Sequence, residues 1–274
     1  MNPHHTAHAG PGAFDIVVIL AVLVLAGGYL ALAVRRGREP RGWSRWRSAS
    51  FLAGCVLLIL GLLPALSPFP AGDLRGHMHQ HLLTGMYAPI GLVLGAPVTL
   101  LLRTLPARSG RRIGRLLRSR PVHLVANPII ALGLNLGGLA ALYFTPLYLA
   151  TARSPALHHL VSVHFLLAGC LFAWVIAGPD PAPHRPRVPA RLVALGVAIL
   201  GHSILAQLLY AGAFVQLPGV AADERRGAGD LMYYGGDIAE LLLALALVTT
   251  WRPVRPPTAW ERAPVVPGRH AALG

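Results

Sequence analysis

Seven blocks of apolar residues, each long enough to cross a lipid bilayer, dominate this chain. A bilayer core of roughly 30 Å needs a helix of about 20 residues. The blocks cover residues 14–34, 51–66, 77–102, 128–148, 158–177, 190–215 and 231–251. They lack the strict alternation of barrel strands, and only a helix satisfies its own backbone groups in lipid. We therefore predict an all-α, polytopic transmembrane helix bundle with seven spans.

The charge of the chain agrees with a membrane location. Charged residues make up only 12% of the sequence, yet the formal net charge is +14, because 24 basic residues outnumber 10 acidic ones. In a soluble protein, such an excess would suggest a nucleic-acid partner. Here the arginines lie between the apolar blocks, so we predict a lipid bilayer as the partner and no nucleic acid.

The arginines also predict the direction of the spans. Twenty of them lie in the first, third and fifth connections and in the tail, whereas only Arg75, Arg153, Arg225 and Arg226 lie elsewhere. Short cytoplasmic loops are enriched in positive residues. The N-terminus is therefore expected outside and the C-terminus in the cytoplasm. The first block is expected to remain as an anchor, because no small-residue cleavage site follows it.

Three regions are expected along the chain. Residues 1–13 form a short external tail, residues 14–252 form the transmembrane domain, and the Pro- and Arg-rich residues 253–274 form a disordered cytoplasmic tail. Within the connection at residues 108–120, the apolar residues Ile113, Leu116 and Leu117 fall on one helical face among arginines. Such a helix is expected to lie on the inner leaflet, with its arginines near anionic headgroups.

Two histidine clusters begin spans that enter from the predicted outer side. His77 and His81 are one turn apart and share a helix face, with Met78 beside them. In the fifth span, His158 lies at the start and His164 about two turns deeper. Ionisable residues inside a membrane are costly, which indicates a functional role for these histidines.

The last span supplies further potential ligands on the same side. Met232 lies near its start, and Asp237 and Glu240 follow with a spacing of three residues. Imidazole and thioether groups favour copper over magnesium or calcium, although zinc would accept the same histidines and carboxylates. We therefore predict a copper site at the outer end of the bundle. The alternative is that individual histidines cap helices or are hydrated at the interface.

His202 differs from the other histidines because it lies near the middle of the sixth span. It could be a deeper metal ligand, a proton-relay group or an axial haem ligand, or it could only form a hydrogen bond to a neighbouring helix. Cys55 and Cys170 are expected at different depths, which predicts two free thiols. Two GxxxG motifs, at residues 91–95 and 133–137, are spaced for close helix packing.

The string HMHQHLLTGMYAPIGLVLGAPVTLLLRTLP, from His77 to Pro106, resembles the signature stretch of the CtaG-type cytochrome c oxidase assembly factors. The similarity continues through YFTPLYLATARSPALHHLVSVHFLLAG, from Tyr143 to Gly169, and through GDLMYYGGDIAELLLAL at the start of the last span. It covers most of the chain from about residue 50 to residue 252.

This resemblance implies a multi-pass protein of the bacterial plasma membrane that helps to assemble caa(3)-type terminal oxidases. An oxidase subunit is its implied partner, and copper insertion is the usual proposal for its role. Two positions depart from the family pattern: Ser162, where another histidine is expected, and Asn127, where His-Pro is frequent. The family positions that transfer are His77, Met78, His81, His158, His164, His202 and Met232.

We therefore expect a non-catalytic protein that binds copper at its outer face and delivers it to an oxidase subunit. Asp237 and Glu240 are expected as ligands or as groups that orient the imidazoles. Three alternatives stay open: a copper transporter, a membrane cytochrome with His202 and His164 as axial haem ligands, and a metal-free assembly scaffold. A transporter would need a continuous polar path, and the inner halves of the spans contain few polar residues.

Overall fold

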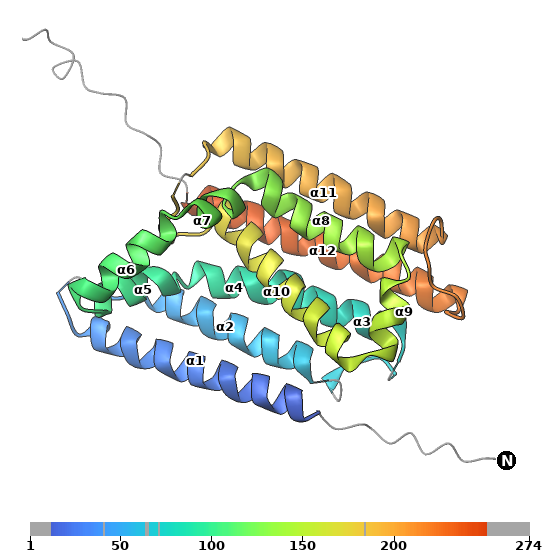
Figure 1. Cartoon of the computed structure of the whole chain (residues 1–274), viewed down its shortest axis with the longest axis horizontal. Helices are drawn as coiled ribbons and strands as arrows, with labels where there is room; N and C mark the ends of the chain where they lie inside the picture. The colour runs from blue at the N-terminus through green and yellow to red at the C-terminus, as the bar shows by residue number, and fades with distance from the viewer. Residues whose placement is uncertain (1–11, 41, 64–65, 71, 184, 251–274) are drawn as a thin grey trace, which may run out of the picture.

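The structure, a computed structural model, describes residues 12–40, 42–63, 66–70, 72–183 and 185–250, and in this part of the chain it contains helices and no strands (Figure 1). The all-α prediction is therefore confirmed. The helices are α1 (Ala13–Gly37), α2 (Arg45–Leu62), α3 (Leu74–His81), the π-helix η2 (Leu82–Tyr87), α4 (Ala88–Leu94), α5 (Pro97–Thr104), α6 (Ala107–Leu117), α7 (Arg120–Val125), α8 (Pro128–Phe144), α9 (Leu147–Arg153), α10 (Pro155–Ile176), α11 (Val188–Ala211) and α12 (Ala222–Thr250).

Six helical segments are long and apolar enough to cross a membrane, and the bent pair α8–α9 provides a seventh candidate. The polytopic bundle is thus confirmed, and the predicted count of seven equals the upper value. Several helices begin before the apolar blocks; the third candidate runs over Leu74–Thr104 and the last begins at Ala222. The predicted disordered tail at residues 253–274 lies outside the described residues.

The fourth predicted span, residues 128–148, is not one straight helix. The chain bends by 76° between α8 and α9. Pro146 disfavours the helical conformation of the residue before it, and Thr145 is extended, with φ −126° and ψ 169°. The bend returns α9 toward the start of α10, so this segment closes one end of the bundle instead of leaving it (Figure 1).

The third span also contains breaks. Pro89 has no N–H group to donate to the carbonyl of Gly85, so the regular α-helical pattern cannot continue there. The chain forms the π-helix η2 one turn earlier, and the N–H of Ala88 donates to the Leu83 carbonyl. A second break follows at Ala96, whose φ of 53° is left-handed, and α5 then begins at Pro97.

The helices form a layered bundle in which the third span is central (Figure 1). On one side, α2 packs along α4, and α1 packs on α2 at the edge of the bundle. On the other side, α11 and α12 form an extensively packed pair, and α8 and α10 lie against each other. The start of α3 and the helix α9 lie at one end, whereas α6 and α7 lie at the opposite end (Figure 1).

The two GxxxG motifs have different surroundings. A Cβ added at Gly91 would lie 2.8 Å from the backbone of Gly54, so this glycine permits the close contact of α4 with α2. At Gly133 and Gly137, an added Cβ would meet nothing within 4 Å. The predicted packing role is thus confirmed for the first motif and wrong for the second within the described chain. Both cysteines are free, as predicted.

The connection with alternating arginines and apolar residues forms the helix α6, as predicted. Ile113, Leu116 and Leu117 lie within about 100° of one another around its axis. Ile113 and Leu117 are half-buried, whereas Leu116 is 64% exposed. An exposed apolar side chain on this face is available to the inner leaflet, whose contact with α6 stays a prediction.

Candidate functional site

The side chain of Asp73 fixes the start of α3, the helix that carries most of the candidate ligands. Its carboxylate accepts a hydrogen bond of 2.8 Å from the N–H of Arg75, which caps the helix. The guanidinium of Arg75 also donates to the same carboxylate, at 2.5 and 3.0 Å. These hydrogen bonds lower the pKa of Asp73 below its ordinary value. The carboxylate therefore stays charged and holds this end of α3 in place.

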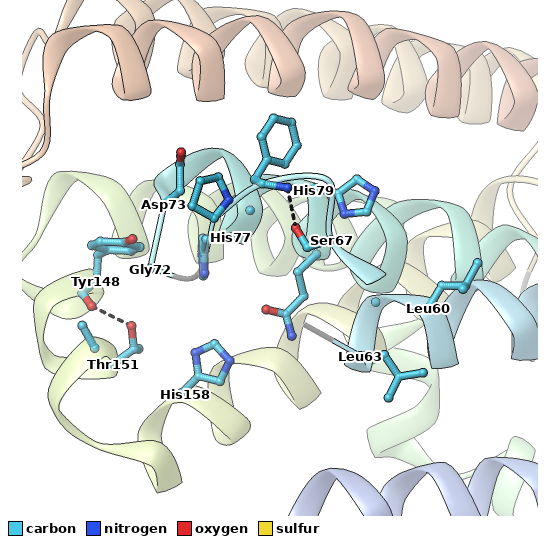
Figure 2. A pocket seen from close by; sticks show the side chains of 16 residues that line it. Leu60, Leu63, Ser67, Gly72, Asp73, His77, His79, Tyr148, Thr151 and His158 are labelled. Carbon is cyan, nitrogen blue, oxygen red and sulfur yellow. Dashed lines mark hydrogen bonds between the residues drawn. The ribbon is translucent and has the colours of Figure 1, made fainter. Parts of the chain in front are cut away.

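A cavity of about 390 Å³ opens at this end of the bundle, between α3, α9, α10 and the loop before α3. His77 from α3 and His158 from α10 both line it, with Tyr148 and Thr151 of α9 beside them (Figure 2). The ring centroids of His77 and His158 are 6.2 Å apart, and those of His77 and Tyr148 are 5.1 Å apart. The structure thus brings together the two predicted histidine clusters through one residue of each.

A smaller cavity of about 10 Å³ lies next to the first and shares His77 and His158 with it. His81 lines this second cavity, and its ring lies edge-on to Phe165 with a centroid distance of 4.6 Å. Ser162, one turn after His158, also lines it. The resemblance to the family leads one to expect a histidine at position 162. A side chain at this position lines the smaller cavity.

His202 reaches the same region from α11. A Cβ added at Gly236 of α12 would collide with the His202 ring, so only glycine leaves room for this imidazole. His202 is 1% exposed. His81 is also buried, one turn after His77 on the same helix, and lines the smaller cavity with it. We call His77, His81 and His202 the histidine series.

Five ring nitrogens of these three histidines lack hydrogen-bond partners in the described part of the chain. Within the described residues, Nε2 of His77 and both nitrogens of His81 and His202 are buried and form no hydrogen bond. Buried polar atoms are nearly always hydrogen-bonded, so orphaned imidazole nitrogens suggest a missing ligand. Neutral imidazole is a good ligand for copper and zinc, which makes these atoms chemically suitable for a soft or borderline metal ion.

The two predicted methionine ligands are fully buried beside this region. Met78 and Met232 belong to one cluster of buried side chains, together with Tyr143. The ring of Tyr143 lies 6.3 Å from that of His77, and its hydroxyl is buried without a hydrogen-bond partner among the described residues. Met78 comes from α3 and Met232 from α12, two helices that pack on each other. Both thioethers are packed in this apolar cluster, and neither lines the two cavities that the histidines share.

The other three predicted ligands lie apart from this series. Nε2 of His164 is 3.2 Å from the carbonyl oxygen of Leu134, so this ring faces α8. Asp237 accepts a hydrogen bond of 3.5 Å from the hydroxyl of Ser203. Glu240 lines a separate cavity of about 30 Å³ with Asn135. In residues 12–40, 42–63, 66–70, 72–183 and 185–250, no group of three or more His, Cys, Asp and Glu side chains is arranged to hold a metal ion.

Two aromatic residues of the site were not among the predicted ligands. Tyr143 and Tyr148 lie at the end of α8 and at the start of α9, where they contact His77. Both belong to the string from Tyr143 to Gly169 that carries the family resemblance. That string could have identified both tyrosines as candidate residues of the site. The 76° bend that brings both rings to α3 could not be predicted from it, because the bend depends on the fold.

These features define an α-helical multi-pass membrane protein with a buried histidine site at one end of the bundle. Comparison with known families identifies the family: residues 27–253 match the model of the cytochrome c oxidase caa3 assembly factor family (Caa3_CtaG). The chain belongs to this family. It has relatives in mycobacteria, and together with its apolar helices this is consistent with a multi-pass membrane protein of bacteria.

Two curated relatives illustrate the similarity. The uncharacterized protein Mb0105 of Mycobacterium bovis is 32% identical over 257 residues, which are 87% of this chain and 39% of that protein. The uncharacterized protein ML1998 of Mycobacterium leprae is 30% identical, with the same coverage. The chain thus spans about two fifths of the length of these relatives. No solved structure matches the chain.

Proposed function

We propose that this protein assists the assembly of a caa3-type cytochrome c oxidase by binding copper at the histidine site and delivering it to an oxidase subunit. The family supports the role in oxidase assembly. The observation that supports copper as the cargo is the histidine series, in which five ring nitrogens are buried without a partner among the described residues. No catalytic step is part of the proposal.

Each part of the site has a role in the proposal. The large cavity admits copper, and His77 and His158 at its wall are the first ligands. His81 and His202 hold the ion deeper in the bundle, while the thioethers of Met78 and Met232 favour copper in its reduced state. His164, Asp237 and Glu240 are outside the proposed ligand set because they face other groups.

The geometry suits a carrier better than a resident metal centre. A tight structural site holds its metal with three or four fixed ligands. Here, His77 and His158 line a cavity that is open to the surface, and their ring centroids are 6.2 Å apart. An ion held at the wall of this cavity by two imidazoles alone can be transferred to a partner, as delivery requires.

Copper loading of the purified protein tests this proposal. The double variant His77→Ala with His81→Ala is expected to lose copper that the wild type holds at about one ion per chain, measured by elemental mass spectrometry after loading under reducing conditions. The matched control is His164→Ala, which removes an imidazole that faces α8. The control should retain copper. Retention by the double variant, or no copper in the wild type, would contradict the proposal.

A metal-free scaffold is the second candidate, because no group of three His, Cys, Asp or Glu side chains within the described residues is arranged around a metal. The same variants distinguish the two functions in cells. If the protein is a copper carrier, cells with the double variant should contain an oxidase that lacks copper. If it is a scaffold, oxidase assembly should stay normal despite the loss of both histidines.

A further inference from the structure

Two arginines at the end of the bundle that carries α6 share one aromatic ring. The guanidinium carbon of Arg47, in α2, lies 5.1 Å from the centroid of the Trp43 ring, and that of Arg103, in the last turn of α5, lies 5.6 Å from it. Stacking on an aromatic ring orients a guanidinium while its N–H groups remain available for other partners. All three side chains are half-buried. The cluster therefore combines two positive charges from different spans.

The cluster is held in place by hydrogen bonds. The indole N–H of Trp43 donates to the hydroxyl of Tyr29 at 3.2 Å, and this hydroxyl donates to the carbonyl of Gly95 at 2.7 Å. Arg103 also donates to the carbonyl of Gly42 at 3.3 Å. Three helices, α1, α2 and α5, thus fix the positions of the ring and the two guanidinium groups. Such an arrangement is pre-organised for a ligand.

No acidic side chain among the described residues forms an ion pair with Arg47 or Arg103. Of the acids near this end, Glu39 pairs with Arg36. Asp180 accepts hydrogen bonds from the backbone N–H groups of Val98 and Thr99, at the start of α5. Both carboxylates are therefore engaged elsewhere. The two guanidinium groups are therefore available to an anion from outside the described chain.

We propose that the Trp43–Arg47–Arg103 cluster binds the phosphate of an anionic phospholipid headgroup. Guanidinium groups bind phosphate through parallel hydrogen bonds, and tryptophan rings prefer the headgroup level of a bilayer. The cluster lies where three candidate membrane spans begin or end: Phe14–Gly37, Arg45–Leu62 and Leu74–Thr104. This position at the ends of three apolar helices favours a lipid over a free phosphate ion or an acidic protein.

Lipid titration of the purified protein tests this site. The wild type, in a neutral detergent, is titrated with phosphatidylglycerol and separately with phosphatidylcholine, and binding is followed by native mass spectrometry. The double variant Arg47→Gln with Arg103→Gln should bind phosphatidylglycerol about thirty-fold more weakly, since each basic side chain near an anionic surface contributes roughly a factor of five. The comparison variant, Arg111→Gln with Arg112→Gln, removes the same charge from exposed positions of α6. These arginines also face headgroups but are not oriented by an aromatic ring, so this variant should weaken binding several-fold less than the cluster variant.

A second variant separates the contribution of charge from that of hydrogen-bond geometry. This double variant, Arg47→Lys with Arg103→Lys, keeps the charge but loses the paired hydrogen bonds, and an intermediate affinity is expected. Equal binding of the two lipids by the wild type, or equal losses in the cluster and α6 variants, would overturn the proposal. The proposal would also be overturned if inorganic phosphate or an acidic peptide displaced phosphatidylglycerol and bound the cluster as tightly as the lipid does.

Discussion

At the level of single residues, Glu240 is the least expected feature of the bundle. This carboxyl is 5% exposed, and its Oε2 atom is buried without a hydrogen-bond partner among the described residues. The cavity beside it is otherwise lined mainly by apolar groups, with Asn135 as the main polar neighbour. A buried polar atom without a partner costs about 1–3 kcal/mol. Glu240 is therefore expected to destabilise the fold.

Replacing Glu240 by an apolar residue of similar length should show this cost. We expect Glu240→Met to raise the midpoint of thermal unfolding in detergent by roughly 2–12 °C, because it removes an unsatisfied polar group and keeps the volume. Copper loading should be unchanged, since Glu240 lies outside the proposed ligand set. Leu243→Met, at the wall of the same cavity, is the control for side-chain flexibility. A loss of copper in Glu240→Met would instead identify Glu240 as a ligand.

Some residues of the histidine site could be predicted from the sequence and others could not. His77 and His81 were predicted on one helix face, and both line the smaller cavity. His158 and His164 are six residues apart and therefore lie on different faces of a helix with 3.6 residues per turn. This spacing could have excluded His164 from the site. The contact of His202 with Gly236 depends on how α11 and α12 pack, which no local pattern reveals.

At the level of elements, the break between α4 and α5 depends on a residue from another part of the chain. Oδ2 of Asp180, in the loop after α10, accepts from the Val98 N–H at 3.0 Å, and Oδ1 accepts from the Thr99 N–H at 2.6 Å. These are N–H groups of the first turn of α5, which its own N-cap residue, Ala96, cannot satisfy through a side chain. Asp180 thus acts as the cap of a helix that is distant in sequence.

Removing this cap should destabilise the protein. We expect Asp180→Ala to lower the midpoint of thermal unfolding by roughly 2–8 °C, because losing a helix cap costs about 1–2 kcal/mol. Copper loading should persist, since the histidine site lies at the opposite end of the bundle. Asp230→Ala, at an exposed position of α12, is the matched control and should unfold like the wild type. An unchanged midpoint in Asp180→Ala would show that the cap contributes little.

The elements themselves were predictable to different degrees. Uniformly apolar blocks predicted the helices because a helix is the only open-ended structure that satisfies its backbone in lipid. Pro89 and Pro97 indicate a kink in the third span, and this span does contain breaks. The bend after α8 was not predicted, although Pro146 marks it. Proline can be tolerated in a membrane helix when neighbouring groups satisfy the freed carbonyl. Whether a given proline kinks or ends a helix is therefore decided by tertiary packing.

At the level of the whole molecule, the histidine site and the arginine-rich helix α6 lie at opposite ends of the bundle (Figure 1). If both ends reach the membrane surfaces, the site faces one compartment and α6 the other. The distribution of arginines predicts that α6 faces the cytoplasm, because short cytoplasmic loops attract positive residues. Delivery to the outer part of an oxidase requires this orientation.

Cysteine accessibility in intact cells tests the orientation. In a background with Cys55 and Cys170 replaced by alanine, a single cysteine is introduced either at Ala221, just before α12, or at Ala107, at the start of α6; both positions are exposed. A membrane-impermeant maleimide should label Ala221→Cys in intact cells and label Ala107→Cys only after lysis. Labelling of both in lysed cells is the control for reactivity. The reverse pattern in intact cells would place the histidine site on the cytoplasmic side, where copper could reach an oxidase only through a different route.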